Sequence, residues 1–318
     1  MRIDCHAHYF PGTYLDLVDA IGRNEVETKM GRRGAFRTHA EDASPRIEAM
    51  DKGGVEMQIL SIATGGPYVQ SEIGATICAR VANDDYAEMV RLHPSRFKAF
   101  ACLPFPHVQP ALDELARAFD QLGFVGVGVA TKMGGKSLAD ASFDPVYEEL
   151  NRRAGVLFVH PIGHSCDSSL LDETNLTWPL GAPFEDTAAA LQLIQTGFLQ
   201  KFPKIKVIMP HLGGTLPFLV HRLDHQRDRF MNGVEGVPSE LVKRFWYDSV
   251  NSHPAALRCA VDTFGADKIV FGTDYPFWGG HAHQNACEYI EHAGLADHVI
   301  AAIADGNARD LFGDLLLA

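Results

Sequence analysis

Short apolar runs rich in β-branched residues alternate along the chain with longer stretches whose hydrophobic residues recur at helical spacing. A strand followed by a helix, repeated many times, is typical of parallel βαβ units. We predict eight strands, over residues 2–8, 55–62, 97–103, 125–130, 156–160, 206–211, 245–250 and 268–273. We predict helices between them, over residues 71–92, 111–122, 145–154, 185–200, 216–229, 254–264 and 297–312.

Eight strands that alternate with helices predict a (β/α)8 barrel of the TIM type. The 318 residues fit either two ordinary domains or one such barrel with insertions. We expect one domain, residues 1–318, with lid insertions after the first and fifth strands at about 11–44 and 162–184. A doubly wound open sheet is the alternative, but a glycine-rich turn usually follows its first strand. Here the sequence His-Tyr-Phe-Pro stands at that place.

Charge and hydropathy narrow the range of partners. Lysine and arginine number 28 against 40 aspartate and glutamate residues, so the net charge is −12 and no basic surface for nucleic acid is expected. No apolar run reaches the ~20 residues of a membrane span, and the first residues do not resemble a signal peptide. The six cysteines include no CxxC pair, which fits a reducing compartment. We therefore expect a cytoplasmic protein with neither nucleic acid nor membrane as its partner.

Five side chains suited to metal binding or proton transfer fall at the carboxyl ends of the predicted strands. They are His6 and His8 on the first strand, His160 on the fifth, His211 on the sixth and Asp274 after the eighth. Because side chains alternate along a strand, His6 and His8 share one face. The other face, with Ile3, Cys5 and Ala7, is expected to lie against the helices. Catalytic residues of this fold gather at the carboxyl ends of the strands, so these five predict an active site.

The donor types indicate a single divalent metal. Zinc accepts imidazole nitrogen and carboxylate oxygen, and a catalytic zinc site keeps one position open. We expect His6, His8, His160 and Asp274 as ligands of zinc, although manganese, iron and cobalt also suit this donor set. His211 is then left for proton transfer, a role that imidazole performs near neutral pH. The plain alternative is that these groups cap the barrel for structural reasons.

Four motifs carry a family resemblance. They are DCHAH at residues 4–8, FVHP at 158–161, PHLGG at 210–214 and FGTDYPF at 271–277. Together they resemble the metal-dependent decarboxylase branch of the amidohydrolase superfamily, from residue 1 to about residue 312. The resemblance implies a (β/α)8 barrel that holds one divalent metal, usually zinc, through His6, His8, His160 and Asp274. It also implies that His211 is the acid–base residue.

Within this branch, the sequence is most similar to the 2-amino-3-carboxymuconate-6-semialdehyde decarboxylases. Ring decarboxylases often have glutamate at the position of His6, so the histidine favours the muconate-semialdehyde side. Arg37 and Arg222 resemble the arginines that hold substrate carboxylates there, and the second arginine comes from the neighbouring subunit of a homodimer. Trp178 and Phe277 match aromatic positions that flank the substrate. Surface exposure of the arginines and lid packing of the aromatic residues are the alternatives.

The resulting prediction is a metal-dependent, non-oxidative decarboxylase, a carbon–carbon lyase. Its expected substrate is 2-amino-3-carboxymuconate-6-semialdehyde or a close conjugated or aromatic analogue. Either water adds to the substrate before CO2 leaves, or His211 or Asp274 protonates carbon directly. One alternative is a hydratase or hydrolase of a related unsaturated diacid at the same metal site, which a modified Lys132 bridging two metals would favour. A metal-binding scaffold without catalysis is the other.

Overall fold

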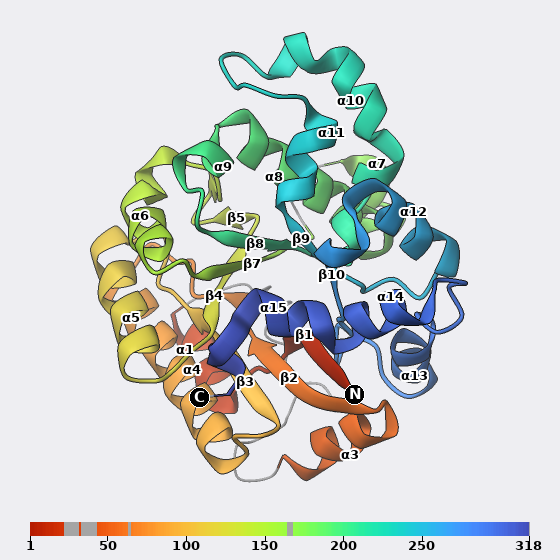
Figure 1. The fold of residues 1–318 in the computed structure, drawn as a ribbon. Coiled ribbons are helices and arrows are strands. Elements are labelled where there is room, and N and C mark those ends of the chain that lie inside the picture. Colours follow the sequence, from red (N-terminus) through yellow and green to blue (C-terminus); the bar gives the residue numbers. More distant parts are fainter. Residues whose placement is uncertain (22–31, 33–42, 63–64, 164–167, 318) are drawn as a thin grey trace.

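The computed structural model describes residues 1–21, 32, 43–62, 65–163 and 168–317 (Figure 1). Eight parallel strands follow one another in chain order around a barrel, with helices outside them. The strands are β1 (Arg2–His8), β2 (Val55–Ser61), β3 (Phe97–Cys102), β4 (Gly126–Ala130), β7 (Val156–His160), β8 (Lys206–Met209), β9 (Trp246–Asp248) and β10 (Ile269–Val270). The predicted (β/α)8 barrel is confirmed.

The barrel closes between β1 and the segment that follows β10. This seam has no regular ladder along its length, but an isolated parallel bridge joins Ala7 to Tyr275. The amide of Asp274 donates to the carbonyl of His6 at 2.8 Å, and the amide of Cys5 donates to the carbonyl of Phe271 at 2.9 Å. The first and last strands therefore meet at the height of the candidate ligands.

The last three strands end earlier than predicted because side chains replace the backbone acceptors of the ladder. After β9, the amide of Val250 donates to the Asp248 carboxylate at 3.1 Å. After β10, the amide of Gly272 donates to Ser249 Oγ at 3.1 Å. Backbone that is bonded to side chains in this way leaves the regular strand, which shapes this end of the barrel.

The helices of the structure include a counterpart of each predicted helix and also helices that were not predicted, such as those at residues 12–20, 44–52 and 281–288. The helices are α1 (Gly12–Ala20), α3 (Ser44–Lys52), α4 (Glu72–Leu92), α5 (Val108–Asp120), α6 (Asp144–Arg152), α7 (Ser169–Asp172), α8 (Ala182–Gln195), α9 (Phe198–Lys201), α10 (Leu216–Phe230), α11 (Pro238–Leu241), α12 (Pro254–Phe264), α13 (His281–Glu288), α14 (Asp297–Ala301) and α15 (Asn307–Phe312). The helix predicted over 185–200 is divided at Gly197, whose φ of 70° lies in the left-handed region. The helix predicted over 297–312 is divided by a π-helical turn at Ala302–Gly306.

The interior of the barrel shows that one prediction about β1 was wrong. Ile3 and Cys5 pack inside the barrel with residues such as Phe158, and not against the helices. The register of β1 against β2 shifts between Asp4 and Ala7. A bulge of this kind changes which face the following residues occupy, so His6 and His8 still point inward. α15 covers the amino end of the barrel, opposite these histidines (Figure 1).

The insertions differ in how much of them is described. In the second, the turn Thr177–Gly181 and the start of α8 lie at the carboxyl end of the barrel and contribute to a cavity there. In the first, α1 packs against α4 through buried residues that include Tyr14 and Val18. Residues 22–31 and 33–42 lie outside the described part of the chain.

A small hairpin after β4 was not predicted. β5 (Lys132–Met133) and β6 (Lys136–Ser137) pair antiparallel, and the two-residue turn between them, Gly134-Gly135, has positive φ at both positions. A Gly-Gly pair between short extended segments is the sequence signal for such a turn. None of the helices in the described part of the chain combines the length and hydrophobicity that a membrane span needs.

Candidate metal and acid–base site

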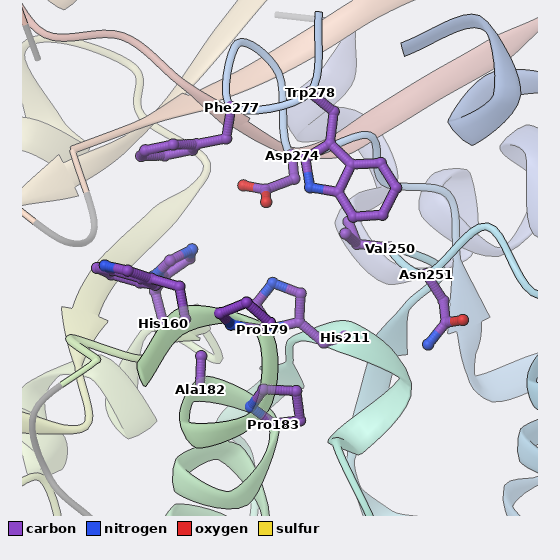
Figure 2. Close-up of a pocket in the computed structure, with 11 residues that line it drawn as sticks. His160, Pro179, Ala182, Pro183, His211, Val250, Asn251, Asp274, Phe277 and Trp278 are labelled. Atoms are coloured by element: carbon purple, nitrogen blue, oxygen red, sulfur yellow. The ribbon is translucent and has the colours of Figure 1, made fainter. Parts of the chain in front are cut away.

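Five side chains from four strands meet at the carboxyl end of the barrel, as the sequence predicts. One ligand atom from each of His6, His160, His211 and Asp274 lies within 4.8 Å of the others. His8 joins them, because its Nε2 lies 3.0 Å from His6 Nε2 and 3.1 Å from Asp274 Oδ1. His6 Nε2 itself lies 3.3 Å from the same carboxylate oxygen. Figure 2 shows His160, His211 and Asp274 around a common space.

Hydrogen bonds on the outer side of each ring determine which nitrogen faces the cluster. His6 Nδ1 donates to Asp248 Oδ2 at 2.7 Å, and His160 Nδ1 donates to the carbonyl of Pro161 at 2.8 Å. His8 Nδ1 lies 3.1 Å from Ser61 Oγ. Each ring therefore turns its Nε2 toward the centre, which is the orientation of metal-binding histidines.

His160 supplies the clearest indication of a metal site. Its Nε2 is buried and has no hydrogen-bond partner among the described residues. Because Nδ1 already donates to Pro161, Nε2 carries a lone pair and no proton. A buried acceptor without a partner is costly, and a divalent metal between these side chains would satisfy it. The donor set of imidazoles and one carboxylate thus fits such an ion.

Burial and the neighbouring charges determine the protonation states in the cluster. Burial lowers the pKa of His8 to about 4 and that of His160 well below its ordinary value, so both rings are neutral. Burial also opposes the charge on His6, but Asp248 and Asp274 outweigh it and raise the pKa of His6 to about 10. Burial raises the pKa of Asp274, yet hydrogen bonds from His6 and His8 leave that pKa well below its usual value. His6 is consequently protonated beside the ionised carboxylate of Asp274, and a metal that bound here would displace the proton from His6 Nε2.

His211 differs from the other histidines because its outer partner is a buried carboxylate. Its Nδ1 donates to Asp186 Oδ2 at 2.8 Å, and its backbone amide donates to Asp248 Oδ1 at 2.9 Å. Burial works against the charged ring, but Asp186 outweighs it and raises the pKa of His211. Burial raises the pKa of Asp186 itself to about 6. His211 and Asp186 together are therefore suited to hold and transfer a proton.

Two of these residues have an unusual backbone conformation. His211 and Asp274 have φ values of 54° and 58°, in the left-handed region that side chains with a Cβ rarely adopt. The bonds from His211 N to Asp248 and from Asp274 N to the His6 carbonyl hold these conformations. Strained backbone of this kind is concentrated at functional sites.

A cavity of about 490 Å³ opens directly onto the cluster. It is lined by His160, Trp178, Pro179, Ala182, Pro183, His211, Val250, Asn251, Asp274, Phe277 and Trp278. Figure 2 shows Phe277 and Trp278 on the side of Asp274, with the prolines and Ala182 opposite. The walls are thus apolar and partly aromatic, while the polar groups converge at one end, as in many binding sites for small molecules.

The structure places the predicted substrate residues unequally. Trp178 and Phe277 line the cavity as expected. Arg222 is exposed on α10 and does not belong to the described lining of this cavity. Arg37 lies outside the described residues. Lys132 is exposed on the β5–β6 hairpin and is not part of the cluster of ligand atoms.

Sequence reasoning missed two carboxylates that organise the site. Asp248 lies in the predicted strand 245–250, near its carboxyl end, so the rule that selected the histidines could have found it. It binds His6 and His211 at once. Asp186 lies inside the predicted helix 185–200, where the local pattern carries no signal of its contact with His211.

Comparisons with known proteins agree with this geometry. A family model described as Amidohydrolase matches residues 3–313. The chain is 29% identical over 295 residues to a 2-amino-3-carboxymuconate-6-semialdehyde decarboxylase of Dictyostelium discoideum, across 87% of this chain and 82% of the relative. It is 31% identical over 291 residues to a gamma-resorcylate decarboxylase of Polaromonas sp. strain JS666, across 84% of this chain and 86% of the relative.

A solved structure extends the match to the whole fold. It is a dihydroxybenzoic acid decarboxylase from Polaromonas sp. JS666 with bound manganese and the inhibitor 2-nitroresorcinol. Its TM-score to this chain is 0.82 at 25% identity, across 98% of this chain and 97% of that one. These three proteins are decarboxylases, carbon–carbon lyases that remove carboxyl groups, and they give no support to the hydratase alternative. The chain therefore belongs to the amidohydrolase family, among relatives that are metal-dependent decarboxylases.

Proposed function

We propose that this protein is a metal-dependent, non-oxidative decarboxylase of a conjugated or aromatic carboxylic acid. The observation that carries the proposal is the buried, unpartnered Nε2 of His160 beside a proton-carrying pair, His211 and Asp186, at the end of an apolar cavity. Most buried polar groups of a structural cluster are hydrogen-bonded, so an unpartnered buried acceptor favours a ligand site over a structural cap of the barrel. The names of the relatives support the same reaction class.

We assign His6, His8, His160 and Asp274 to the metal, which we expect to be zinc. The manganese bound in the Polaromonas structure supports a divalent ion as the metal, and iron or cobalt would fit the same donors. When bound, the ion would supply positive charge that withdraws electrons from an oxygen of the substrate. The neutral rings of His8 and His160 and the ionised carboxylate of Asp274 are the protonation states that such ligands need.

We assign proton transfer to His211. Loss of CO2 breaks a carbon–carbon bond and leaves its electron pair on carbon, where a proton must be added. Protonated His211 donates this proton from Nε2, while Asp186 accepts the hydrogen bond from Nδ1 and holds the ring in place. Asp274 is the other predicted acid–base residue, but its low pKa makes it a poor proton donor. Both routes, with or without prior addition of water, need this carrier.

The cavity supports a planar acid as substrate. Trp178, Phe277 and Trp278 offer aromatic faces on which a ring or a conjugated chain can stack. The first candidate remains 2-amino-3-carboxymuconate-6-semialdehyde, and hydroxybenzoic acids such as 2,6-dihydroxybenzoate are the second. The Dictyostelium and Polaromonas relatives support one candidate each.

Release of CO2 tests this function directly. Protein purified without chelators and of measured metal content is incubated with both candidate acids. We expect CO2 from at least one acid, loss of this activity with a chelator, and its return when zinc or manganese is added. A product that has gained water while no CO2 is released would contradict the proposal.

We also propose that the protein is a homodimer in which Arg222 reaches the neighbouring cavity. Arg222 and Phe218 are four residues apart on α10 and therefore share one face of the helix. Phe218 is 87% exposed in the single chain, so its ring is available to pack against a second copy of the protein. A guanidinium group presented beside this contact could bind a substrate carboxylate. A single domain over residues 1–318 and a cytoplasmic location stay predictions of the sequence.

Mixing two inactive variants tests whether Arg222 acts across the interface. Arg222→Ala and His211→Ala are each expected to be nearly inactive, but their mixed dimer contains one intact site. After dissociation and random reassociation, activity should return to roughly one quarter of the wild-type value, as expected for a two-fold dimer. Arg229→Ala, a second exposed arginine on α10, is the control and should keep full activity. Failure of the mixture to recover activity would assign Arg222 to its own chain or to the surface.

A further inference from the structure

A chain of buried polar side chains lies behind the metal cluster, on the outer face of β1 and β2. Its members are Arg46 of α3, Gln58 of β2, Asp4 of β1 and Thr273 beyond β10, and none of them is exposed to solvent. Arg46 Nη1 donates to Gln58 Oε1 at 3.1 Å, and Gln58 Nε2 donates to Asp4 Oδ2 at 2.9 Å. Thr273 Oγ1 donates to the same oxygen of Asp4 at 2.6 Å. We refer to these four residues as the seam network.

The network joins the two sides of the barrel seam. Asp4 Oδ1 accepts the amide of His6 at 3.1 Å and the amide of Thr273 at 3.0 Å. A single carboxylate thus binds the strand that carries His6 and the segment that carries Asp274. Because the seam has an isolated bridge and a few backbone hydrogen bonds but no regular ladder, these side chains help to fix the register of the two segments.

Arg46 holds the far end of β1. Its Nη2 donates to the carbonyl of His8 at 2.6 Å. Its guanidinium carbon lies 4.8 Å from the centre of the Tyr275 ring, within the range of a cation–π contact. Arg46 therefore contacts the backbone of His8, which is a candidate ligand, and the ring of Tyr275, which follows the candidate ligand Asp274.

We infer that the seam network positions His6, His8 and Asp274 for metal binding, so that its members determine metal affinity without touching the ion. The inference rests on the proposed metal site. The network would act by fixing two distances between ligand atoms. His6 Nε2 lies 3.3 Å from Asp274 Oδ1, and His8 Nε2 lies 3.1 Å from the same oxygen. Loss of a side chain that merely stabilised the fold would lower the free energy of unfolding but would leave the metal affinity of the folded protein unchanged.

Two nearly isosteric substitutions distinguish positioning of the metal ligands from stabilisation of the fold. Thr273→Val removes the hydroxyl that binds Asp4, and Gln58→Met removes the link between Asp4 and Arg46. We expect each folded variant to bind zinc about 10- to 100-fold more weakly than the wild type, the range for loss of outer hydrogen-bond partners of a metal site. Affinity is measured by competition with a chromophoric chelator, and circular dichroism shows that the variants are folded.

Asn83→Leu is the matched control. Asn83 is equally buried and donates to the Cys102 carbonyl at 2.9 Å and to Glu114 at 2.7 Å, outside the seam. We expect it to reduce thermal stability and to keep wild-type zinc affinity. Thr273→Val changes the side-chain volume very little, so we expect this variant to fold. It therefore tests the effect of the seam network on zinc affinity even if Gln58→Met fails to fold. Wild-type affinity in folded Thr273→Val would overturn the inference, whereas absence of zinc, manganese and cobalt binding by the wild type would overturn the proposed function instead.

Discussion

His211→Ala is expected to keep its metal and to lose about 100-fold or more in kcat, the lower end of the contribution of a general acid or base. The physical reason is that, among the described residues that line the cavity, only His211 combines a raised pKa with a buried carboxylate partner; His6 shares these features but is not part of the lining. Alanine removes the proton donor and leaves His6, His8 and His160 in place. The measurement is steady-state decarboxylation with parallel determination of bound metal.

Asp186→Asn is the matched comparison for this experiment. It keeps the size of the side chain but removes the negative charge that supports protonated His211. We expect a smaller loss of kcat than in His211→Ala, with metal content unchanged. If His211→Ala instead loses its metal, His211 is a ligand, a role that its position in the cluster permits. Turnover close to wild type would remove it from the mechanism.

His160→Ala is expected to abolish stoichiometric metal binding. Loss of a residue that hydrogen-bonds to a metal ligand lowers metal affinity by up to roughly 100-fold. This substitution removes a ligand itself, so the affinity for zinc should fall by more than that. Metal per chain, measured by atomic emission after gel filtration, should drop from about one to near zero, consistent with the single open zinc site expected of a catalytic centre. Decarboxylation should disappear with the metal and return only at high zinc concentration.

His292→Ala is the control for His160→Ala, because His292 is an exposed histidine outside the cluster. Its metal content and activity should equal those of the wild type. Unchanged metal content in His160→Ala would show that the ligand set is wrong. In that case, the unpartnered Nε2 of His160 would need another explanation, such as a buried water molecule.

Much of this fold could be predicted because the barrel repeats one local pattern. Each apolar run is buried on both faces, and each following helix has one buried stripe, so hydrophobic spacing alone locates β1, β7 and α12 to the residue. Catalytic residues of this fold lie at the carboxyl ends of the strands. This rule alone predicts that one site contains His6, His8, His160, His211 and Asp274.

The parts that could not be predicted depend on contacts between distant segments. The bulge in β1 places Cys5 inside the barrel, against the strict alternation that periodicity assumes. The early end of β10 follows from bonds to Ser249 and to Asp4, far away in the chain. Asp186 reaches His211 only because α8 passes beside the end of β8. Side-chain partners of this kind leave no trace in local sequence.

The closure of the barrel also has a consequence for biosynthesis. Asp274 lies 266 positions after His8, yet its carboxylate lies 3.1 Å from the ring of that histidine. A ribosome must therefore translate past residue 274 before this carboxylate can approach the imidazoles of His6 and His8. We expect nascent chains that end before residue 274 to capture zinc poorly, so that metallation follows translation and awaits the docking of the final βα segment.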